Sequence, residues 1–232
     1  QGDKPAECTP VQIEVYYTSV NAQSRRFFLD QLVPVFRNLR ERIHLDLIPY
    51  GVPNVSSTID EECMAHDRVC LANKAQACAI KKYFDDDKID GSIQYDGKNQ
   101  TLAFIACMFK NIEDLDTAKL AEQCANKNII LADVVMECAN QPEGRDYLLE
   151  MRNRSLAQYD TMDHTPWVVV NGLRSTMAES DLKQAICSVM LGDLPDYCNE
   201  PTPAKVAVQF HYSSLDNAAQ AYFIDELYPN YR

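Results

Sequence analysis

The chain has 232 residues, 46% of them hydrophobic, and a formal net charge of −12. This length and apolar content predict a globular protein with one substantial core, or one domain with an appendage. The negative charge argues against nucleic acid as a partner, and no apolar run approaches the ~20 residues that would insert into a membrane as a spanning helix. The sequence starts at Gln1 without a methionine or a signal peptide, which we interpret as a processed mature form.

The first part of the chain predicts a βαβ unit after an irregular segment, residues 1–10. Apolar and polar residues alternate over 11–17 and again over 43–47, as in half-buried strands. Between them, apolar residues at helical spacing predict a helix over 22–41. Two consecutive strands joined by a helix pair in parallel through a right-handed crossover.

A helical block is predicted over residues 62–162, where apolar residues recur with helical periodicity. Strand character returns over 167–170, and Asn171-Gly172 after it is a strong hairpin signal. A final helix is predicted over 182–190, with Gly192 as its C′ cap.

A βαβ unit, a helical insertion and a ββα unit make up the thioredoxin arrangement. We therefore predict a disulfide-rich α/β protein with a thioredoxin-like fold and an inserted helical block, over residues 11–199. In that fold a cis-proline precedes the late strand and faces the active-site loop. Thr165-Pro166-Trp167 places a proline there, and we predict a cis bond before Pro166, the alternative being a proline that begins an edge strand.

Cysteines and sequons together indicate an oxidising compartment. The chain carries nine cysteines, a number seldom found in a cytosolic protein of this size unless it binds metal. Asn54, Asn99 and Asn153 each begin an Asn-x-Ser/Thr glycosylation sequon. We expect a secreted glycoprotein, with the lysosome as the alternative location.

Several segments resemble the gamma-interferon-inducible lysosomal thiol reductases, the GILT family, over about residues 11–198. The family signature, Cys-Gln-His-Gly-x-x-Glu-Cys-x-x-Asn-x-x-x-x-Cys, is similar to CMAHDRVCLANKAQAC, in which Cys63, Cys70, Asn73 and Cys78 keep the spacing. Further similarity lies in LIPYG, MECA and TPWVVVNG. The resemblance implies a thioredoxin-like fold and a thiol–disulfide oxidoreductase ancestry. It is nearest to insect members that lack Cys-x-x-Cys, including mosquito salivary proteins.

The departure from the family lies in the active-site loop. Family reductases carry Cys-x-x-Cys, sometimes Cys-x-x-Ser, where this chain has Asn21-Ala22-Gln23-Ser24. The chemistry needs a thiolate at the first position to attack a substrate disulfide. An asparagine amide cannot do this, and Ser24 has no histidine beside it in the sequence to activate it. We expect no catalytic residue here, and we interpret Asn21 as the N-cap of the first helix.

The cysteines form no Cys-x-x-Cys motif, and we expect structural disulfides. The spacing favours two local pairs and two further bridges, of undecided connectivity, among four cysteines of the helical block. The local pairs are Cys107–Cys124 and Cys187–Cys198. The remaining four are Cys63, Cys70, Cys78 and Cys138. The odd Cys8 is expected to pair downstream, to link two chains in a disulfide-linked or tandem assembly, or to stay a free thiol.

Zinc binding by Cys63, His66, Cys70 and Cys78 is a weaker alternative, because structural zinc favours tighter Cys-x-x-Cys knuckles and thiols in an oxidising compartment tend to be bridged. We expect neither a metal nor another cofactor.

The C-terminal tail repeats the start of the chain. Residues 208–232 align without gaps on residues 13–37, with Tyr, Ser, Phe, Asp, Leu, Pro and Arg at identical spacing. We interpret the tail as the strand and helix of a second, degenerate unit of the same family, cut off at Arg232. A linker over 200–207 precedes it, and its loop, residues 216–219, also lacks cysteine.

The functional expectation is a redox-silent binding protein. Thioredoxin-like folds read extended peptide beside the cis-proline, so the expected binding residues are Asn21–Ser24 and Thr165–Trp167. The expected partner is a protein or a cell or microbial surface. The first alternative is a weak thiol–disulfide exchanger that uses Cys8 or a bridge within 63–78, and the second is an inert storage or carrier protein.

Overall fold

The computed structural model describes residues 9–85, 96–111, 116–128, 130–158 and 160–201. Its contacts divide the chain into two units, residues 1–200 and 201–232. The first unit is described below. Cys8 and the repeat predicted over 208–232 lie outside the described residues.

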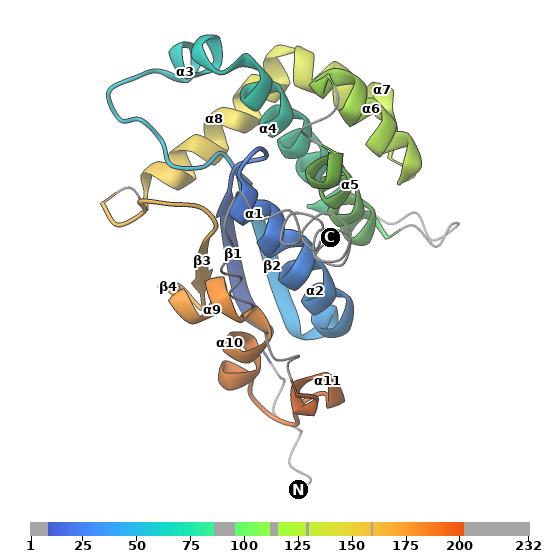
Figure 1. Cartoon of the computed structure of the whole chain (residues 1–232), viewed down its shortest axis with the longest axis vertical. Coiled ribbons are helices and arrows are strands. Elements are labelled where there is room, and N and C mark those ends of the chain that lie inside the picture. The colour runs from blue at the N-terminus through green and yellow to red at the C-terminus, as the bar shows by residue number, and fades with distance from the viewer. Residues whose placement is uncertain (1–8, 86–95, 112–115, 129, 159, 202–232) are drawn as a thin grey trace, which may run out of the picture. The chain divides into compact units, whose positions relative to one another are not determined.

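A four-stranded sheet with the order β2-β1-β3-β4 organises the first unit (Figure 1). Its strands are β1 (Val11–Tyr17), β2 (Ile43–Pro49), β3 (Trp167–Val170) and β4 (Leu173–Arg174). β1 runs parallel to β2 and antiparallel to β3. The predicted βαβ unit is therefore confirmed. So is the hairpin, since Asn171 and Gly172 both have positive φ, as a tight primed turn requires.

The sheet is buried on both faces, which explains why its inner strands are so apolar. One face, which includes Val15 and Val168, joins the main core together with Phe28 and Phe36 of the first helical run. The alternate residues pack into a second cluster, in which Trp167 meets Met151 and Met162. Successive residues of a strand point to opposite faces of the sheet, and here both faces are covered by apolar clusters.

The first helical run is continuous but not regular. It comprises α1 (Ala22–Phe27), a π-helical stretch (Phe28–Leu32), α2 (Val33–Leu39) and a short 3-10 turn (Arg40–Arg42). Pro34 sits in the first turn of α2, where its missing N–H would otherwise break the helical bonding. The π-helical stretch just before Pro34 accommodates the missing hydrogen bond. The predicted single helix therefore changes its hydrogen-bonding pattern at this point and continues instead of ending.

The helical insertion contains six α-helices among the described residues. They are α3 (Ile59–Ala65), α4 (Asp67–Ala79), α5 (Gly97–Asn111), α6 (Thr117–Lys127), α7 (Ala132–Asn140) and α8 (Pro142–Leu156). Figure 1 shows them gathered around the upper end of the sheet, with α5 beside α1 and α2. The helical insertion begins earlier than predicted, because Thr58 and Glu61 form a reciprocal capping box that begins α3 at Ile59.

Three further helices close the unit: α9 (Thr176–Ser180), α10 (Leu182–Val189) and α11 (Asp196–Asn199). The prediction of Gly192 as the C′ cap of α10 is wrong. The helix ends at Val189 and the next residue, Met190, is already extended, so Gly192 takes its positive φ in the following loop. No described helix is both long and apolar enough to span a membrane.

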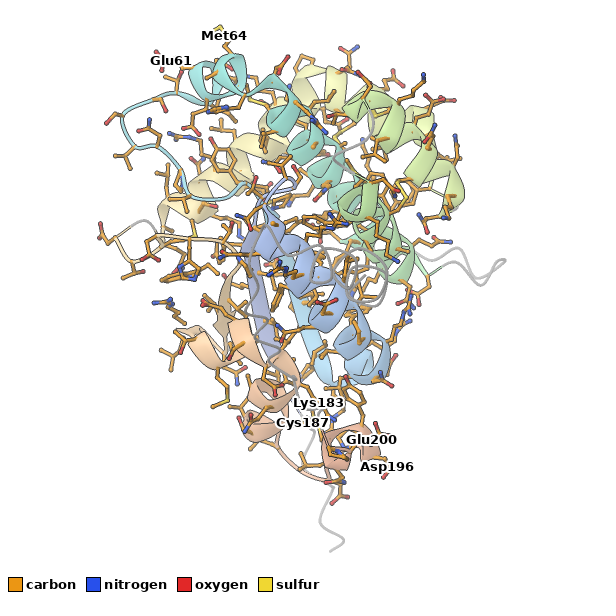
Figure 2. The ribbon with its side chains drawn as sticks, in the orientation of Figure 1. Glu61, Met64, Lys183, Cys187, Asp196 and Glu200 are labelled. Atoms are coloured by element: carbon orange, nitrogen blue, oxygen red, sulfur yellow. A yellow bond between two sulfur atoms is a disulfide. The ribbon has the colours of Figure 1, made fainter. Side chains whose placement is uncertain are left out.

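Four disulfides join helices that follow one another or pack together. They are Cys63–Cys70, Cys78–Cys138, Cys107–Cys124 and Cys187–Cys198. The last of these joins α10 to α11, where Lys183 points toward Glu200 (Figure 2) and donates to its carbonyl at 2.6 Å. The structure thus settles the connectivity that the spacing left open, and it contains the two expected local pairs.

Candidate functional site

The loop from β1 to α1 leads into Asn21-Ala22-Gln23-Ser24, where the resemblance predicts the redox motif of the family. Asn21 has extended backbone angles, and its side-chain oxygen accepts a hydrogen bond from the backbone N–H of Ser24 at 2.8 Å. This is the geometry of an N-cap, which satisfies one of the free N–H groups at a helix start. Asn21 therefore has the structural role that its sequence position predicted.

Ser24 stands where the family resemblance predicts the second cysteine of a Cys-x-x-Cys motif. It is fully buried, and its hydroxyl has no hydrogen-bond partner among the described residues. A serine nucleophile needs a base within hydrogen-bonding reach to remove its proton. Ala22 and Gln23, by contrast, are exposed. The loop thus presents a neutral surface and no described group that could attack a disulfide.

Asn73 of α4 fixes the position of this loop. Its side-chain oxygen accepts a hydrogen bond from the N–H of Ser19 at 3.0 Å, and its amide nitrogen donates to the carbonyl of Tyr50 at 3.4 Å. One buried side chain thereby ties the loop after β1 to the loop after β2. Asn73 was recognised in the sequence as part of the family signature. The spacing of the signature did not predict its hydrogen bonds to Ser19 and Tyr50.

The segment that contains Pro166 emerges at the same end of the sheet. The Thr165–Pro166 peptide bond is cis. Because β1 and β3 are antiparallel with Tyr16 opposite Trp167, residues just before Trp167 lie at the end of the sheet where β1 gives way to its loop. However, Thr165, Pro166 and Trp167 are all buried. The surface near them is formed by their neighbours, not by these side chains.

Exposed apolar side chains mark the two loops that Asn73 connects. Val20 is 38% exposed, Val52 44% and Val55 51%. The loops approach closely, since a Cβ added to Gly51 would lie 3.1 Å from Cβ of Thr18. We call these three valines the apolar rim. Apolar side chains on rigid loops beside a neutral helix start suit contact with another polypeptide.

His164, just before Thr165, belongs to a charged network that sequence reasoning missed. Its Nδ1 lies 2.6 Å from a carboxylate oxygen of Asp163, and its Nε2 lies 3.1 Å from one of Glu179 on α9. Nε of Arg174 lies 3.6 Å from the other oxygen of Glu179. The Arg174 guanidinium also stacks 3.7 Å over the Trp167 ring. The Asp163–His164 pair is visible in the sequence, but nothing in the sequence predicts that Glu179 contacts His164.

The predicted glycosylation sites differ in their surroundings. Asn54 and Asn153 are exposed, whereas Asn99 is half-buried and donates its side-chain amide to Asp96 at 2.6 Å.

No described cysteine is a free thiol. All eight are bridged, so the sulfurs of Cys63, Cys70 and Cys78 are not thiolate ligands, and the arrangement offers no zinc knuckle.

Comparison with protein families and curated proteins gives consistent matches. The family model described as "Gamma interferon inducible lysosomal thiol reductase (GILT)" matches residues 12–128. A gamma-interferon-inducible lysosomal thiol reductase of Mus musculus is 26% identical over 205 residues, covering 85% of this chain and 76% of the mouse protein. A GILT-like protein of Caenorhabditis elegans is 30% identical over 176 residues, covering 72% and 73%. A GILT-like protein of Anopheles gambiae is 30% identical over 142 residues, covering 60% and 58%.

Solved structures share the fold at lower identity. The disulfide bond oxidoreductase DsbG of Mycobacterium tuberculosis superposes with a TM-score of 0.55 at 18% identity, covering 84% of this chain and 86% of that chain. DsbA of Chlamydia trachomatis gives 0.52 at 14% identity, covering 74% and 80%. The predicted thioredoxin-like fold with a helical insertion is thereby confirmed.

Proposed function

This chain belongs to the gamma interferon inducible lysosomal thiol reductase family, and we propose that it keeps the family scaffold but acts by non-covalent binding instead of thiol–disulfide exchange. The observation that carries the proposal is Asn21 at the position of the nucleophile. Its side chain caps α1, and a capping amide has neither the charge nor the lone-pair reactivity of a thiolate.

Other groups near the loop do not replace the missing nucleophile. The hydroxyl of Ser24 is buried and contacts no base among the described residues. The described cysteines are held in structural disulfides. Removing the attacking thiolate abolishes the mixed-disulfide step on which turnover depends.

The surface that remains suits a polypeptide partner. Ala22 and Gln23 are exposed at the start of α1, and the apolar rim of Val20, Val52 and Val55 lies on the adjoining loops. The hydrogen bonds of Asn73 hold both loops in place, which lowers the entropy cost of binding. We propose a protein, on its own or on a cell or microbial surface, as the partner. The burial of Thr165–Trp167 shifts the proposed contact from those side chains to the rim.

The proposed location is outside the cytosol. Four disulfides in the described residues fit an oxidising compartment. Asn54 lies in an exposed loop, where a glycan could be carried. Both secretion and a lysosomal location, the latter named for the mouse relative, agree with these features.

A binding experiment tests the proposal without redox chemistry. Carboxymethylated α-lactalbumin is an extended polypeptide whose blocked cysteines cannot form mixed disulfides, so it reports non-covalent binding alone. We expect saturable binding to the immobilised whole chain, weakened about tenfold by Val20→Asp or Val52→Asp. Leu131→Asp is the matched control, because Leu131 is also exposed and lies on the helical insertion. Equal binding by all four proteins, or no binding, would contradict the proposed surface.

A further inference from the structure

We propose that His164 is a proton-controlled clamp, closed at acidic pH and released at alkaline pH, that holds the segment before Pro166 against α9 and thereby regulates the binding surface. The link to binding rests on the proposed function. The clamp itself can be tested without any partner.

The geometry requires the charged imidazole. Both ring nitrogens of His164 face carboxylate oxygens, at 2.6 Å to Asp163 and 3.1 Å to Glu179. A neutral imidazole carries a single N–H and can donate to only one of them, whereas the imidazolium donates to both. When the proton leaves, one ring nitrogen presents a lone pair to a carboxylate and loses its contact. Whichever nitrogen keeps the hydrogen, the contact with Glu179 loses its ionic component, and the clamp is weakened.

Glu179 makes the clamp more than a surface ion pair. Its side chain is only 15% exposed, and a carboxylate removed from water needs a cationic or hydrogen-bonding partner. Its two partners are His164 and Arg174, one at each oxygen. Arg174 is held in turn over the Trp167 ring. Loss of the His164 proton therefore leaves Glu179 with one distant cation, at 3.6 Å.

The direction of the titration follows from these neighbours. The hydrogen bond to Asp163 raises the pKa of His164 above 6.5 despite partial burial, and the hydrogen bond to Glu179 raises it further. The charged groups that face the clamp are Asp163, Glu179 and, through Glu179, Arg174. Since the folded pKa is the higher one, the stabilisation is fully present below the unfolded pKa of about 6.5 and is lost as pH rises through the folded pKa.

The clamp acts on the binding surface through the chain. His164 is two residues from Pro166, whose segment emerges at the end of the sheet beside the loop that follows β1. Its side chain is 38% exposed, so solvent protons reach it directly. A loosened segment is no longer held in one position at the end of the sheet where the loop after β1 begins, and binding must then include the cost of ordering it.

Titration of the imidazole nitrogens by NMR, on the whole chain, tests the clamp directly. We expect His164 to titrate above the ordinary histidine pKa of about 6.5, and to lose part of this increase in the Glu179→Gln variant. His44, an exposed histidine on β2, supplies the control substitution. Amide exchange of residues 163–165 and 167 should accelerate between about pH 6 and about pH 8 beyond its intrinsic increase. That excess should vanish in His164→Gln and persist in His44→Gln. A His164 pKa at or below about 6.5, or no excess exchange, would overturn the clamp.

Binding of carboxymethylated α-lactalbumin tests the regulatory link. We expect affinity to fall about fivefold or more from pH 5 to pH 8, and His164→Gln to remove this dependence. A clamp that titrates with no change in affinity would overturn the link while leaving the proposed function intact. Absence of binding at every pH would instead contradict the proposed function, and the titration would still decide the clamp.

Discussion

The side-chain oxygen of Asn73 accepts a hydrogen bond from the backbone N–H of Ser19 at 3.0 Å, across 54 residues of sequence. Both residues are buried. With its donation to the carbonyl of Tyr50, this side chain links the loop after β1 to the loop after β2. The first loop leads into Asn21, the predicted position of the nucleophile, and the two loops carry the apolar rim, so the proposed binding surface depends on Asn73.

Replacement of Asn73 by alanine should destabilise the fold. The N–H of Ser19 would be left buried without its partner, at a cost of about 1–3 kcal/mol in the free energy of unfolding. Chemical denaturation measures the change. The control is Asn126→Ala, because Asn126 is an exposed asparagine in α6, and it should shift stability by less than about 0.5 kcal/mol. Equal effects of the two substitutions would contradict the bridging role.

Arg152 should be the most sensitive charged residue of the insertion. It is 9% exposed, and its guanidinium donates to the carbonyls of Asn54 at 2.9 Å and Ser57 at 2.7 Å. It also lies 3.4 Å from the carboxylate of Glu62. Arg152→Met removes the only cation paired with Glu62 among the described residues and the donor to both loop carbonyls, while Tyr50 and Ser57 still donate to Glu62. The loss should be about 1–3 kcal/mol of unfolding free energy.

The control for Arg152 is Arg26→Met, at an exposed position of α1. It should change stability by less than about 0.5 kcal/mol. A loss for Arg152→Met no larger than this would show that the loop over residues 51–58 is ordered by other contacts.

Alanine substitutions at two glycines distinguish the cost of a strained backbone from the added cost of a steric contact. Gly51 and Gly172 both have positive φ, at +97° and +80°, but an added Cβ meets Thr18 at 3.1 Å only at Gly51 and meets nothing within 4 Å at Gly172. Alanine should cost about 1–2 kcal/mol at Gly172 for the left-handed backbone. At Gly51 the cost should be larger by about 1 kcal/mol or more, since Thr18 must also shift. Thermal or chemical unfolding of the two variants compares them, and equal losses would contradict the close approach of the loops.

Glycan attachment should distinguish the sequons. At Asn54 the sequon is exposed and forms a local turn, with the side-chain oxygen accepting from the N–H of Ser56 at 3.0 Å. At Asn99 the side-chain amide nitrogen, to which a glycan would be attached, donates a hydrogen bond to Asp96, and Thr101 is fully buried. Glycopeptide mass spectrometry of protein secreted from insect cells should find Asn54 occupied and Asn99 largely unmodified. The reverse pattern would contradict the local geometry.

The sequence pattern predicted the strands well, because residues 11–17 alternate between apolar and polar at their start and residues 167–170 form a short continuous apolar run. Residues 11–17 and 167–170 are strands as predicted. The edges of helices were harder to predict. Gly192 resembled a cap, but α10 ends earlier, at Val189, because local backbone choice after a helix depends on packing that the sequence pattern does not contain. The Thr58–Glu61 capping box, by contrast, was a readable signal for the start of α3.

The candidate site was only partly predictable for a related reason. The N-cap role of Asn21 is local and follows from its place before a helix. The burial of Thr165–Trp167 and the meeting of His164 with Glu179 depend on how separate segments pack, and neither segment signals the other. Side chains that bridge elements distant in sequence are therefore visible only in the structure.

Reduction of insulin disulfides by dithiothreitol, with the whole chain as the added catalyst, tests the central claim most directly. The unmodified protein is compared with the Asn21→Cys/Ser24→Cys variant, which restores a dithiol at the start of α1. We expect insulin reduction with the unmodified protein to proceed at the rate of dithiothreitol alone, and we expect the variant to accelerate it. Acceleration by the unmodified protein would contradict the claim and would turn attention to Cys8 and the Cys63–Cys70 bridge.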